Sequence, residues 1–572
     1  MKYIKYIAPV LFILLMLNSC SKQLDLSPQD TITNAQYWSQ PNDLTIYVNQ
    51  FYTAFPVNNG YFVSPFWADI NSDDMIPGTY DQRLAGENTA SSGNANWNFS
   101  RIRSVNYGLE NYQRIQGTFS QLSAGVGELK FFRAYFYFGL VKLYGDVSWL
   151  SKTINIDSKE LYDGRTKRNI VIDSVLADLD SAIAYLPLKA SASPNRLNKE
   201  CALLFKSRVA LYEGTWEKYH ASTPFGVNGA DFQKYLQAAA TASKTLIDLG
   251  TAQLFIPDDP YNYFREVFGN TDLSSNPEML LWKKNILALG MGLHIQGALY
   301  QGGDRGLSKS LVESFLCKDG LPISTSPLYK GDDNLTDVVT DRDPRLSQSM
   351  WVPGEPYTVK NNVVLEYFSL PWLDKTGELR CTSGYQLAKG RTVRVELAKD
   401  DGETASIIFR YAEALLNYAE AKAELGSLTQ ADVDISINKL RERVQMPDLN
   451  ISAIVTDPNW LYPALSPGIN EIRRERRVEL ACEGYRLDDL ERWADMDRLV
   501  GQRPLGAKFK QSDFPTLVPG SSILVNADGY IDPYQKALPT GYKFKVDRDY
   551  LLPIPQLELN LNENLDQNPG WQ

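Results

Sequence analysis

The segment Glu471–Trp493, EIRRERRVELACEGYRLDDLERW, carries arginines and acidic residues in nearly equal supply. Arg476, Glu479 and Glu483 follow one another at spacings of three and four, so they fall on one stripe of a helix and can form ion pairs. We therefore predict one continuous salt-bridged helix. A helix that binds RNA is the alternative, but the acidic residues along this segment balance the arginines.

Helical patterns also precede this segment in the carboxy-terminal half. SIIFRYAEALLNYAEAKAELG, Ser406–Gly426, is predicted to be a helix that ends at its glycine. A partner helix is expected from Gln430 to Gln445, because Pro447 stops the pattern soon afterwards. Together these segments predict a helical block.

Helices are also expected through most of the first 250 residues. An apolar stripe that starts at Ile172 stops at Pro187, and another helix begins after Asn198, which is a favourable N-cap. A further helix spans about Asp231–Leu249, since Gly250 is well placed to end it. Paired helices with short links indicate a mostly α fold of tetratricopeptide-like pairs, an α/α superhelical array, although no strict repeat period is present.

The most apolar stretch after the first 19 residues is FFRAYFYFGLVKLYGDV, Phe131–Val147. Its composition predicts a helix that is buried on nearly every side. Arg133 lies within it and is expected to have a carboxylate partner, because an unpaired buried charge is costly.

Residues 256–400 differ from the rest of the chain. Gly, Pro, Asp and Ser are frequent there, and continuous amphipathic patterns are scarce, as in MWVPGEPY, Met350–Tyr357. We expect a loop-rich half that contains short strands, in which QGGDRG, Gln301–Gly306, forms a turn. Long ordered loops on a rigid scaffold commonly carry binding residues.

The amino terminus has the pattern of a bacterial export signal. Two lysines precede eleven uncharged residues, Ile7–Leu17, and this run is shorter than the ~20 apolar residues that a membrane-spanning helix needs. LNSC, Leu17–Cys20, resembles a lipobox, in which the cysteine is acylated and becomes the first residue of the mature chain. We expect a signal peptide at 1–19, lipidation of Cys20 and a polar tether over 20–40. A cleaved signal with an incidental cysteine is the alternative.

Composition and charge narrow the possible functions. The chain has 572 residues, 44% hydrophobic and 22% charged, with a formal net charge of −10. These values predict a globular protein and argue against nucleic-acid binding, which depends on basic surface. Beyond Cys20 the cysteines are widely spaced without a CxxC pattern. Cys201 and Cys482 lie in apolar helical patterns and are expected to be buried free thiols, although spacing alone leaves disulfides open.

The sequence contains no recognisable catalytic motif. Its two histidines, His220 and His294, have no partner at metal-ligand spacing, and HExxH, GxSxG and Walker patterns are absent. Acid pairs such as Asp73-Asp74 and Asp488-Asp489 are expected by chance among 68 acidic residues. We therefore predict a protein that is not an enzyme and has no cofactor. A surface glycosidase is the catalytic alternative, and it would need two facing carboxylates about 5–9 Å apart in a cleft.

Two acidic motifs in the loop-rich half are candidates for a structural calcium site. Asp332-Asp333 and Asp341-Arg342-Asp343 lie where irregular loops could offer oxygen ligands. A solvated loop is the simpler interpretation of both, so no metal site is predicted.

Aromatic residues outside the helical stripes are the clearest indication of binding. Tryptophan and tyrosine rings can stack on the C–H faces of sugars, and ligand sites are often partly apolar with a few placed polar groups. Core packing is the competing interpretation for each ring. We expect at least one of the four tryptophans among the candidates to be accessible. The candidates are Tyr61, Phe66, Trp67, Tyr80 and Trp97 in one loop region, and Tyr300, Trp351, Tyr357, Tyr367 and Trp372 in another.

Five segments occur in an order that is known from one protein family. They are RAYFYFGLVKLYGDV, YAEALLNYAEAKAELG, INKLRERVQMP (Ile437–Pro447), IRRERRVELACEGYRLDDLERW and the carboxy-terminal LLPIPQLELNLNENLDQNPGW. With the lipobox they span nearly the whole chain, which thereby resembles the SusD/RagB family. CEGY at Cys482–Tyr485 stands where the family often has Phe-Glu-Gly-His, a difference that concerns packing.

The resemblance implies a function that composition does not show. Members of the family are lipoproteins anchored in the outer membrane of Gram-negative bacteria, where they face the cell exterior as lids on a SusC-like TonB-dependent transporter. They capture glycans, or peptides in some branches, for nutrient uptake, and they are not enzymes. We therefore expect a carbohydrate-binding protein that delivers oligosaccharide to such a transporter. A peptide-binding RagB-like member is the alternative.

The resemblance also implies a division of the mature chain. An N-terminal SusD-like helical part would cover 41–255 and a C-terminal RagB/SusD part would cover 256–572. The latter would comprise the loop-rich 256–400, the helical 405–495 and a C-terminal segment, 496–572. In several glycan-binding relatives, aromatic residues from the two loop regions meet to form the ligand platform, which implies a region for the site and not its individual residues.

Overall fold

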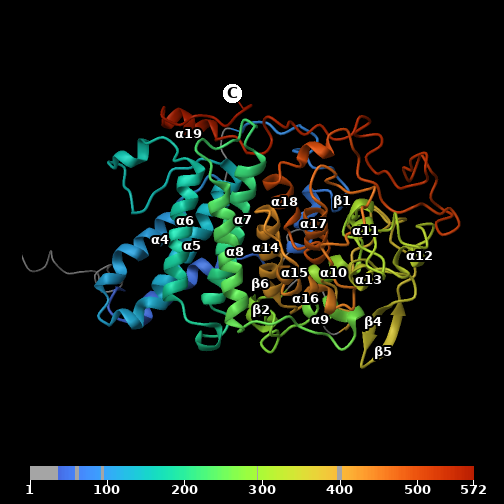
Figure 1. Ribbon diagram of the computed structural model, residues 1–572, viewed down its shortest axis with the longest axis horizontal. Helices are drawn as coiled ribbons and strands as arrows, with labels where there is room; N and C mark the ends of the chain where they lie inside the picture. Colours follow the sequence, from blue (N-terminus) through green and yellow to red (C-terminus); the bar gives the residue numbers. More distant parts are fainter. Residues whose placement is uncertain (1–36, 58–63, 92–95, 293, 396–401, 572) are drawn as a thin grey trace, which may run out of the picture.

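The computed structural model describes residues 37–57, 64–91, 96–292, 294–395 and 402–571 (Figure 1). Cys20 and Tyr61 lie outside the described residues, so lipidation and one aromatic candidate stay predictions. Within the described part of the chain, no helix is both long enough and apolar enough to cross a membrane.

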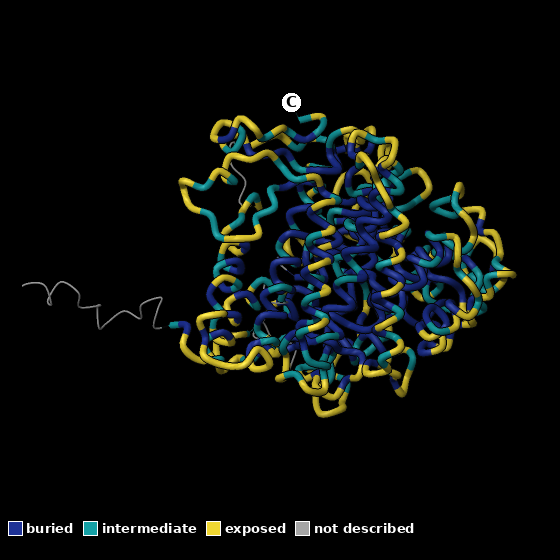
Figure 2. Tube along the Cα trace, turned by 60° about the vertical axis from the view of Figure 1, so that its left-hand side comes forward, coloured by how far each residue is buried: buried dark blue, intermediate teal, exposed yellow. Residues whose placement is uncertain are grey.

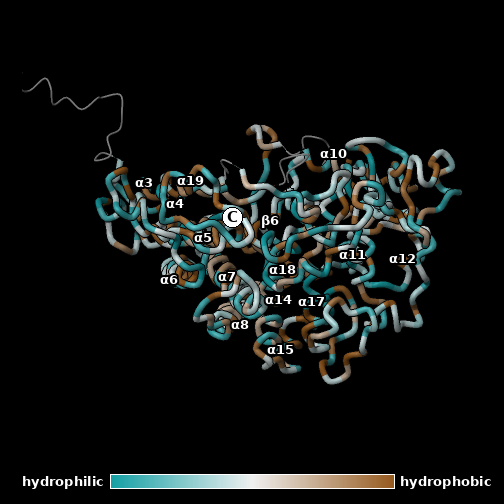
Figure 3. The backbone as a smooth tube through the Cα atoms, turned by 90° about the horizontal axis from the view of Figure 1, so that it is seen from above, coloured by the Kyte–Doolittle hydropathy of each residue, from teal (hydrophilic) through white to brown (hydrophobic). Residues whose placement is uncertain are grey.

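Long helices packed side by side form one half of the molecule. Successive helices contact one another from α5 to α8, and α14 lies against α7 and α8 although it comes much later in the chain. Figures 1 and 3 both show α7, α8 and α14 as neighbours. These pairs confirm the predicted mostly α, tetratricopeptide-like fold. The helices are α3 (Pro41–Asn49), α4 (Ser100–Asn111), α5 (Phe119–Tyr144), α6 (Arg168–Tyr185), α7 (Lys199–Tyr219), α8 (Phe232–Leu249) and α14 (Tyr411–Glu424).

A second group of helices continues from α14 into the centre of the molecule. In it α17 packs against α14, and α18 packs against α7. These helices are α15 (Gln430–Asp434), α16 (Ile437–Glu442), α17 (Pro467–Glu479) and α18 (Arg486–Arg492). The array therefore extends without a gap from the N-terminal helices to the arginine-rich segment.

The rest of the molecule is loop-rich, with short helices and three two-stranded antiparallel sheets. The sheets pair β1 (Met75–Pro77) with β3 (Arg305–Leu307), β2 (Met279–Lys283) with β6 (Ser406–Arg410), and β4 (Pro356–Lys360) with β5 (Val363–Tyr367). The short α-helices are α9 (Tyr263–Phe268), α10 (Ile295–Tyr300), α11 (Lys309–Ser314), α12 (Leu335–Val339), α13 (Pro344–Ser349) and α19 (Gln556–Leu561). The 3-10 helices are η1 (Gln50–Ala54), η2 (Pro65–Asn71), η3 (Tyr112–Arg114), η4 (Lys159–Tyr162), η5 (Lys189–Ser191), η6 (Pro260–Asn262), η7 (Leu287–Leu289), η8 (Gly377–Leu379) and η9 (Met496–Leu499).

Strand pairing anchors the loop-rich half to the helical array. In the β2–β6 sheet Met279 lies opposite Arg410 and Lys283 lies opposite Ser406. The chain therefore leaves the array after β2 and returns beside the same point before α14. The β1–β3 sheet joins the early loop region to the turn at Gln301–Gly306, where Gly303 and Asp304 adopt positive φ.

Capping residues set the helix limits that the sequence predicts. The Asn198 side chain accepts a hydrogen bond from the Cys201 amide at 3.0 Å and starts α7. Gly250 has φ of +63° and ends α8, and Gly426 at +69° follows α14. Left-handed backbone of this kind favours glycine because it has no Cβ.

The predicted helix over Glu471–Trp493 is wrong as a single element. It is broken between α17 and α18, where Cys482 and Gly484 take φ of +59° and +82°. Arg476, Glu479 and Glu483 do not pair with one another: Arg476 pairs with Asp489 at 2.8 Å, Glu479 with Arg410 at 2.6 Å and Glu483 with Lys389 at 2.7 Å. The segment is salt-bridged as predicted, both internally, as in Arg492–Asp489 at 2.8 Å, and to other elements.

Two other predicted helices also need correction. The first five residues of the segment that starts at Ser406 form strand β6, because they pair with β2. The segment Gln430–Gln445 divides into α15 and α16, with Ser436 between them.

The cores follow this architecture. Buried residues are concentrated among the packed helices, and exposed residues mark the outer loops (Figure 2). One core runs from Trp38 through the helices to Ile554, and a second lies in the loop-rich half around Phe264 and Leu346. Both are continuous apolar clusters that hold the loops on the array.

The apolar helix α5 contains the expected buried ion pair. Arg133 donates from Nε to Asp178 Oδ2 at 2.6 Å and from Nη2 to Oδ1 at 2.8 Å, and both side chains are buried. A third bond, from Nη1 to Asn106 Oδ1 at 3.0 Å, links the pair to α4. The prediction of a carboxylate partner is confirmed.

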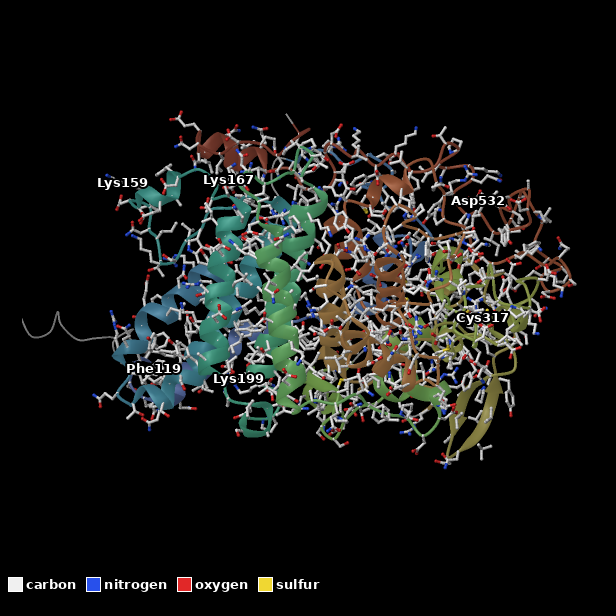
Figure 4. The ribbon with its side chains drawn as sticks, in the orientation of Figure 1. Phe119, Lys159, Lys167, Lys199, Cys317 and Asp532 are labelled. Carbon is white, nitrogen blue, oxygen red and sulfur yellow. The ribbon has the colours of Figure 1, made fainter. Side chains whose placement is uncertain are left out.

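The thiols of the described residues are all unpaired. Cys201 and Cys482 are buried and free, as predicted. Cys317, which Figure 4 labels in the loop-rich half, and Cys381 are also buried and free.

A buried histidine makes the stability of the helical array depend on pH. His220 stacks on Trp216 with ring centroids 3.9 Å apart, and its Nε2 lies 2.8 Å from the carbonyl oxygen of Glu491. Burial lowers the pKa of His220 to about 3, and the nearby Arg168 acts in the same direction. The unfolded chain binds a proton at this side chain near pH 6.5, whereas the folded protein does not until about pH 3. Stability is therefore lost as pH falls through this window.

We expect His220→Gln to reduce the loss of folding stability at low pH. Between pH 6.5 and 4, wild type should lose about 3 kcal/mol more unfolding free energy than the variant, at about 1.4 kcal/mol per pH unit. The amide of glutamine can still donate to the Glu491 carbonyl, so the comparison isolates the titration. Urea unfolding of both proteins across this pH range measures the difference, and parallel pH profiles would contradict it.

Candidate functional site

Five aromatic side chains from separate segments meet in the loop-rich half. Tyr300 ends α10, Trp351 follows α13, Tyr357 lies on β4, Phe368 follows β5 and Trp372 lies in the next loop. We call these five residues the aromatic cluster. Four of them are candidates from the sequence, and Phe368 is not.

The rings of the aromatic cluster contact one another in fixed orientations. Tyr300 and Tyr357 stack with centroids 4.9 Å apart and an interplanar angle of 29°. Trp372 stands edge-on to Tyr300 at 5.7 Å and 80°, and Trp351 stands edge-on to Tyr357 at 4.7 Å and 81°. Offset and edge-to-face pairs are the favourable geometries for aromatic rings. The cluster is therefore a packed unit.

One buried amide holds the segments of the aromatic cluster together. Gln386 donates from Nε2 to the Tyr357 hydroxyl at 3.1 Å and to the Tyr300 carbonyl at 3.4 Å. Its Oε1 accepts from the Trp372 amide at 3.1 Å. The Tyr357 hydroxyl also donates to the Tyr300 carbonyl. A single side chain thus fixes three members of the cluster.

Exposure divides the aromatic cluster into a base and an accessible pair. Trp351 is 0% exposed and Tyr357 is 1% exposed, and Phe368 is also buried. Tyr300 and Trp372 are half-buried. Core packing, the competing interpretation of these aromatics, describes Trp351 and Tyr357, whereas Tyr300 and Trp372 keep accessible ring surface.

Polar groups border the accessible pair. The Tyr300 hydroxyl donates to Glu366 Oε2 at 2.9 Å, and the Thr358 hydroxyl donates to the same oxygen at 3.2 Å. Burial raises the pKa of Tyr300, and Glu366 adds to this effect, so the phenol stays a donor. A half-buried ring beside an exposed carboxylate can offer both a flat face and a hydroxyl acceptor.

A cation lies beneath the same rings. The guanidinium carbon of Arg391 is 5.4 Å from the Tyr300 ring centroid and 6.0 Å from that of Tyr357. Nε and Nη1 of Arg391 find no hydrogen-bond partner among the described residues. Burial lowers the pKa of Arg391 to about 10. The two rings and the nearby Glu366 therefore help to stabilise this cation.

Tyr367 lies on the opposite face of the β4–β5 hairpin from Glu366. It is 59% exposed, and Val363 and Leu365 on the same face of β5 are exposed as well. Alternation along the strand puts these three side chains on one face, away from the aromatic cluster.

The first loop region does not join the aromatic cluster as a unit. Phe66 and Trp67 are buried in the second core, and Arg305 lies over the Trp67 ring at 4.4 Å. Tyr80 is half-buried and donates to Glu87 at 3.3 Å. Trp97 is half-buried and stands edge-on to Tyr144 at 4.9 Å, near the end of α5. Trp67 and strand β1 nevertheless reach the turn that follows Tyr300, since Arg305 lies over the Trp67 ring and β1 pairs with β3.

The acidic motifs of the loop-rich half form contacts with other side chains. Asp332 accepts from the Tyr530 hydroxyl at 2.6 Å, and Asp333 pairs with Lys508 at 2.6 Å. Asp343 pairs with Arg345 at 2.7 Å in a buried position. In the described ranges no group of three His, Cys, Asp or Glu side chains is arranged to hold a metal ion.

The other acid pairs belong to the ion network of the helices. Asp73 pairs with Arg486 at 2.7 Å and Asp74 pairs with Arg477 at 2.7 Å. Asp488 pairs with Lys142 at 2.7 Å. These carboxylates therefore have structural partners in this fold.

Gln386, Arg391 and Phe368 are parts of the site that sequence reasoning missed. Gln386 and Arg391 lie in YQLAKGR, a run without helical or strand periodicity, so nothing local marks them. Phe368 adjoins Tyr367, and a period of two along β5 distinguishes them only once the strand is known.

Two family models match the chain. The model of the SusD family matches residues 291–571, and a model described as starch-binding, associating with the outer membrane, matches residues 23–211. The chain belongs to the SusD/RagB family. The aromatic cluster lies entirely within the SusD match, and α4 to α6 lie within the other.

Individual members of the SusD/RagB family cover most of the chain. SusD-like protein P38 of Formosa agariphila is 25% identical over 533 residues, which cover 86% of this chain and 92% of that protein. SusD-like protein P2 of the same organism is 24% identical over 494 residues, which cover 83% of this chain and 79% of that protein.

Solved structures of the SusD/RagB family confirm the fold. A SusD-like protein from Bacteroides fragilis has a TM-score of 0.70 at 22% identity and covers 95% of this chain and 100% of its own. A SusD-like carbohydrate binding protein from the same species has a TM-score of 0.68 at 21% identity. It covers 93% of this chain and 100% of its own.

Proposed function

We propose that the protein is a surface-exposed outer-membrane lipoprotein that captures an oligosaccharide and delivers it to a SusC-like TonB-dependent transporter. Family membership supports this proposal, as do the starch-binding description of the N-terminal model and the carbohydrate-binding description of a structural relative. We propose that it acts by binding, without a catalytic step.

The observation that carries the proposal is the accessible pair Tyr300 and Trp372. Their rings stand at 80° to one another on a base of buried aromatic residues, with Glu366 at the border. A rigid surface of this kind loses little conformational entropy when a ligand binds. Sugar rings fit it because they present C–H faces to the aromatic rings and hydroxyls to the polar groups.

Calorimetric titration of the purified protein tests the proposal. The panel would contain oligosaccharides of several linkages and an unbiased peptide mixture. We expect saturable binding of at least one glycan. Binding of peptides with no glycan binding would replace this proposal with the peptide-binding alternative.

The transporter can be tested separately. We expect the gene beside this one to encode a TonB-dependent transporter and the two proteins to co-purify from solubilised outer membrane. Purification without any such transporter would contradict the delivery role and leave glycan binding unaffected.

We expect Cys20→Ala to release the protein from the membrane. The acyl chains expected on this cysteine supply the attachment, and one chain alone holds a protein only reversibly. Membranes from cells that lack the transporter should retain wild type and lose the variant. Continued co-sedimentation of the variant would show that Cys20 is not the anchor, and Cys201→Ala is a control with a buried cysteine.

A further inference from the structure

A cavity of about 510 Å³ lies apart from the aromatic cluster and shares no lining residue with it. α11, α17 and the segments 457–462 and 498–505 supply most of its wall. Its volume is in the range of small-ligand sites. No step of the proposed function uses it.

Among the charged residues in the wall of this cavity, basic side chains outnumber acidic ones. Three acidic residues also line it, namely Asp73, Glu313 and Asp457. The basic residues are Lys309, Arg473, Arg474, Arg477, Arg486, Arg498 and Arg503.

Each of these basic side chains has a carboxylate partner, but the partners do not use all of the N–H donors. Asp73 pairs with Arg486 at 2.7 Å and with Arg498 at 2.9 Å, and Asp457 pairs with Arg474 at 2.7 Å. A guanidinium has five N–H donors. Nη1 of Arg474, Arg486 and Arg498 has no acceptor among the described residues. The wall therefore keeps guanidinium donors that the fold does not use.

Aromatic rings adjoin these donors. Trp460 and Tyr462 both line the cavity and are half-buried. The Trp460 indole donates to Glu471 at 3.3 Å, and Tyr462 stands edge-on to Trp493 at 5.7 Å. Glu471 lies on α17 and Trp493 follows α18, so contacts with both helical segments fix the two rings. The cavity combines flat apolar faces with fixed cationic donors.

The C-terminal segment forms part of the same wall. Arg503 pairs with Asp532 at 2.9 Å, which ties the wall to the part of the chain that carries Asp532 (Figure 4). The cavity is therefore built from segments that lie far apart in the sequence, and ion pairs connect its wall to the surrounding structure.

We propose that this cavity binds a uronic acid unit of an acidic oligosaccharide. The carboxylate would accept paired hydrogen bonds from the guanidinium groups, which suit a planar two-oxygen acceptor. The sugar ring would lie against Trp460 or Tyr462. This inference rests on the proposed function only in that the ligand is a glycan. An ion network that serves stability alone is the competing interpretation.

A matched pair of ligands tests the proposal. Oligogalacturonides, oligoglucuronates and oligomannuronates would each be titrated beside the carboxyl-reduced form of the same oligosaccharide, which has the same linkage and length. We expect at least one acidic form to bind with at least tenfold higher affinity than its reduced form. Added salt should make this difference in affinity smaller. Equal binding of every pair, or binding of sulfated oligosaccharides with no uronate binding, overturns the proposal.

Two variants locate the binding in the cavity. Lys309 pairs with Glu313 on the same helix and lies 4.6 Å from the Tyr530 ring centroid, so Lys309→Gln, once its melting temperature matches wild type, should weaken uronate binding at least threefold. Arg474→Gln should weaken it at least tenfold, and Arg474→Lys should weaken it less. Lys244→Gln is the matched control, because Lys244 forms the same kind of i,i+4 pair with Asp248 on α8 and does not line the cavity.

The outcomes separate this inference from the proposed function. Uronate affinity that is unchanged in Lys309→Gln and in a folded Arg474→Gln overturns the cavity assignment. Neutral glycan binding that persists in wild type and both variants, with no preference for uronates, leaves the proposed function standing and removes this inference. If the protein binds no glycan at all, both the cavity inference and the proposed function are wrong.

Discussion

Replacement of Glu479 by glutamine is expected to lower the free energy of unfolding by about 3–5 kcal/mol. Glu479 ends α17 and is fully buried. Its carboxylate pairs with Arg410 and Arg443 at 2.6 Å each and with Arg345 at 3.0 Å. A neutral amide would leave three buried guanidiniums short of negative charge, in a place where water cannot replace it.

The charges around Glu479 explain why its replacement should lower the free energy of unfolding more than most single substitutions do. Burial alone would raise the pKa of this carboxyl, but Arg443, Arg410 and Arg345 outweigh burial and hold the pKa well below its usual range. The group is therefore ionised in the folded protein at any pH used for measurement. Breaking a buried ion pair is costly because the remaining charge stays buried.

Urea unfolding measures this prediction against a matched control. Glu442→Gln on α16 removes a carboxylate of an exposed pair, with Lys439 at 2.8 Å, and should change the unfolding free energy by less than ~1 kcal/mol. A Glu479→Gln variant that unfolds at the same urea concentration as this control would show that the arginine network does not depend on Glu479.

Truncation of the two tryptophans in the aromatic cluster should have opposite consequences. Trp351→Ala removes a fully buried ring that contacts Tyr357 and Phe368, so we expect a loss of about 3–5 kcal/mol in stability. Trp372→Ala removes a half-buried ring and should cost less stability. It should lower glycan affinity by about 1–3 kcal/mol, on the scale measured for stacking of bases on aromatic side chains.

The same two variants serve as controls for each other. Thermal melts and titration with a glycan that wild type binds would be recorded for both proteins. Early melting of Trp372→Ala with unchanged affinity would place its ring in the core. Wild-type stability in Trp351→Ala would contradict the division of the cluster into a base and an accessible pair.

Local signals were sufficient for the N-terminal helices. Asn198 and Gly250 mark the start of α7 and the end of α8, since the cap geometry depends on a few adjacent residues. The break between α17 and α18 has one local signal, Gly484, but the left-handed residue nearer the end of α17 is a cysteine. Cys482 takes a left-handed conformation that few non-glycine residues adopt, and its neighbours in the second core, not its local sequence, hold it there.

Strand β6 shows a second limit of local reasoning. SIIFR is a short apolar run, and such a run fits a buried strand or a buried helix equally well. Its state is decided by β2, whose residues lie more than a hundred positions earlier in the chain.

The candidate site could be predicted as a region and not as a surface. Tyr300 and Trp372 are visible in the sequence as aromatics in loops, but so are Trp351 and Tyr357. Which rings stay accessible depends on Phe368 and Gln386, which approach them through long-range contacts. Fold class and family are therefore open to sequence reasoning, whereas the accessible face requires the three-dimensional arrangement.

The β2–β6 sheet fixes both ends of the loop-rich excursion between residues 284 and 405 at one point of the helical array. Both of its ends are clamped in neighbouring strands, so the cost of closing the loop depends only weakly on its length. Insertions or deletions in its exposed loops can therefore change the ligand face, provided that Arg345 and Lys389 remain to pair with Glu479 and Glu483. On a scaffold of this kind, evolution or protein engineering can change ligand specificity while the helical array keeps its fold.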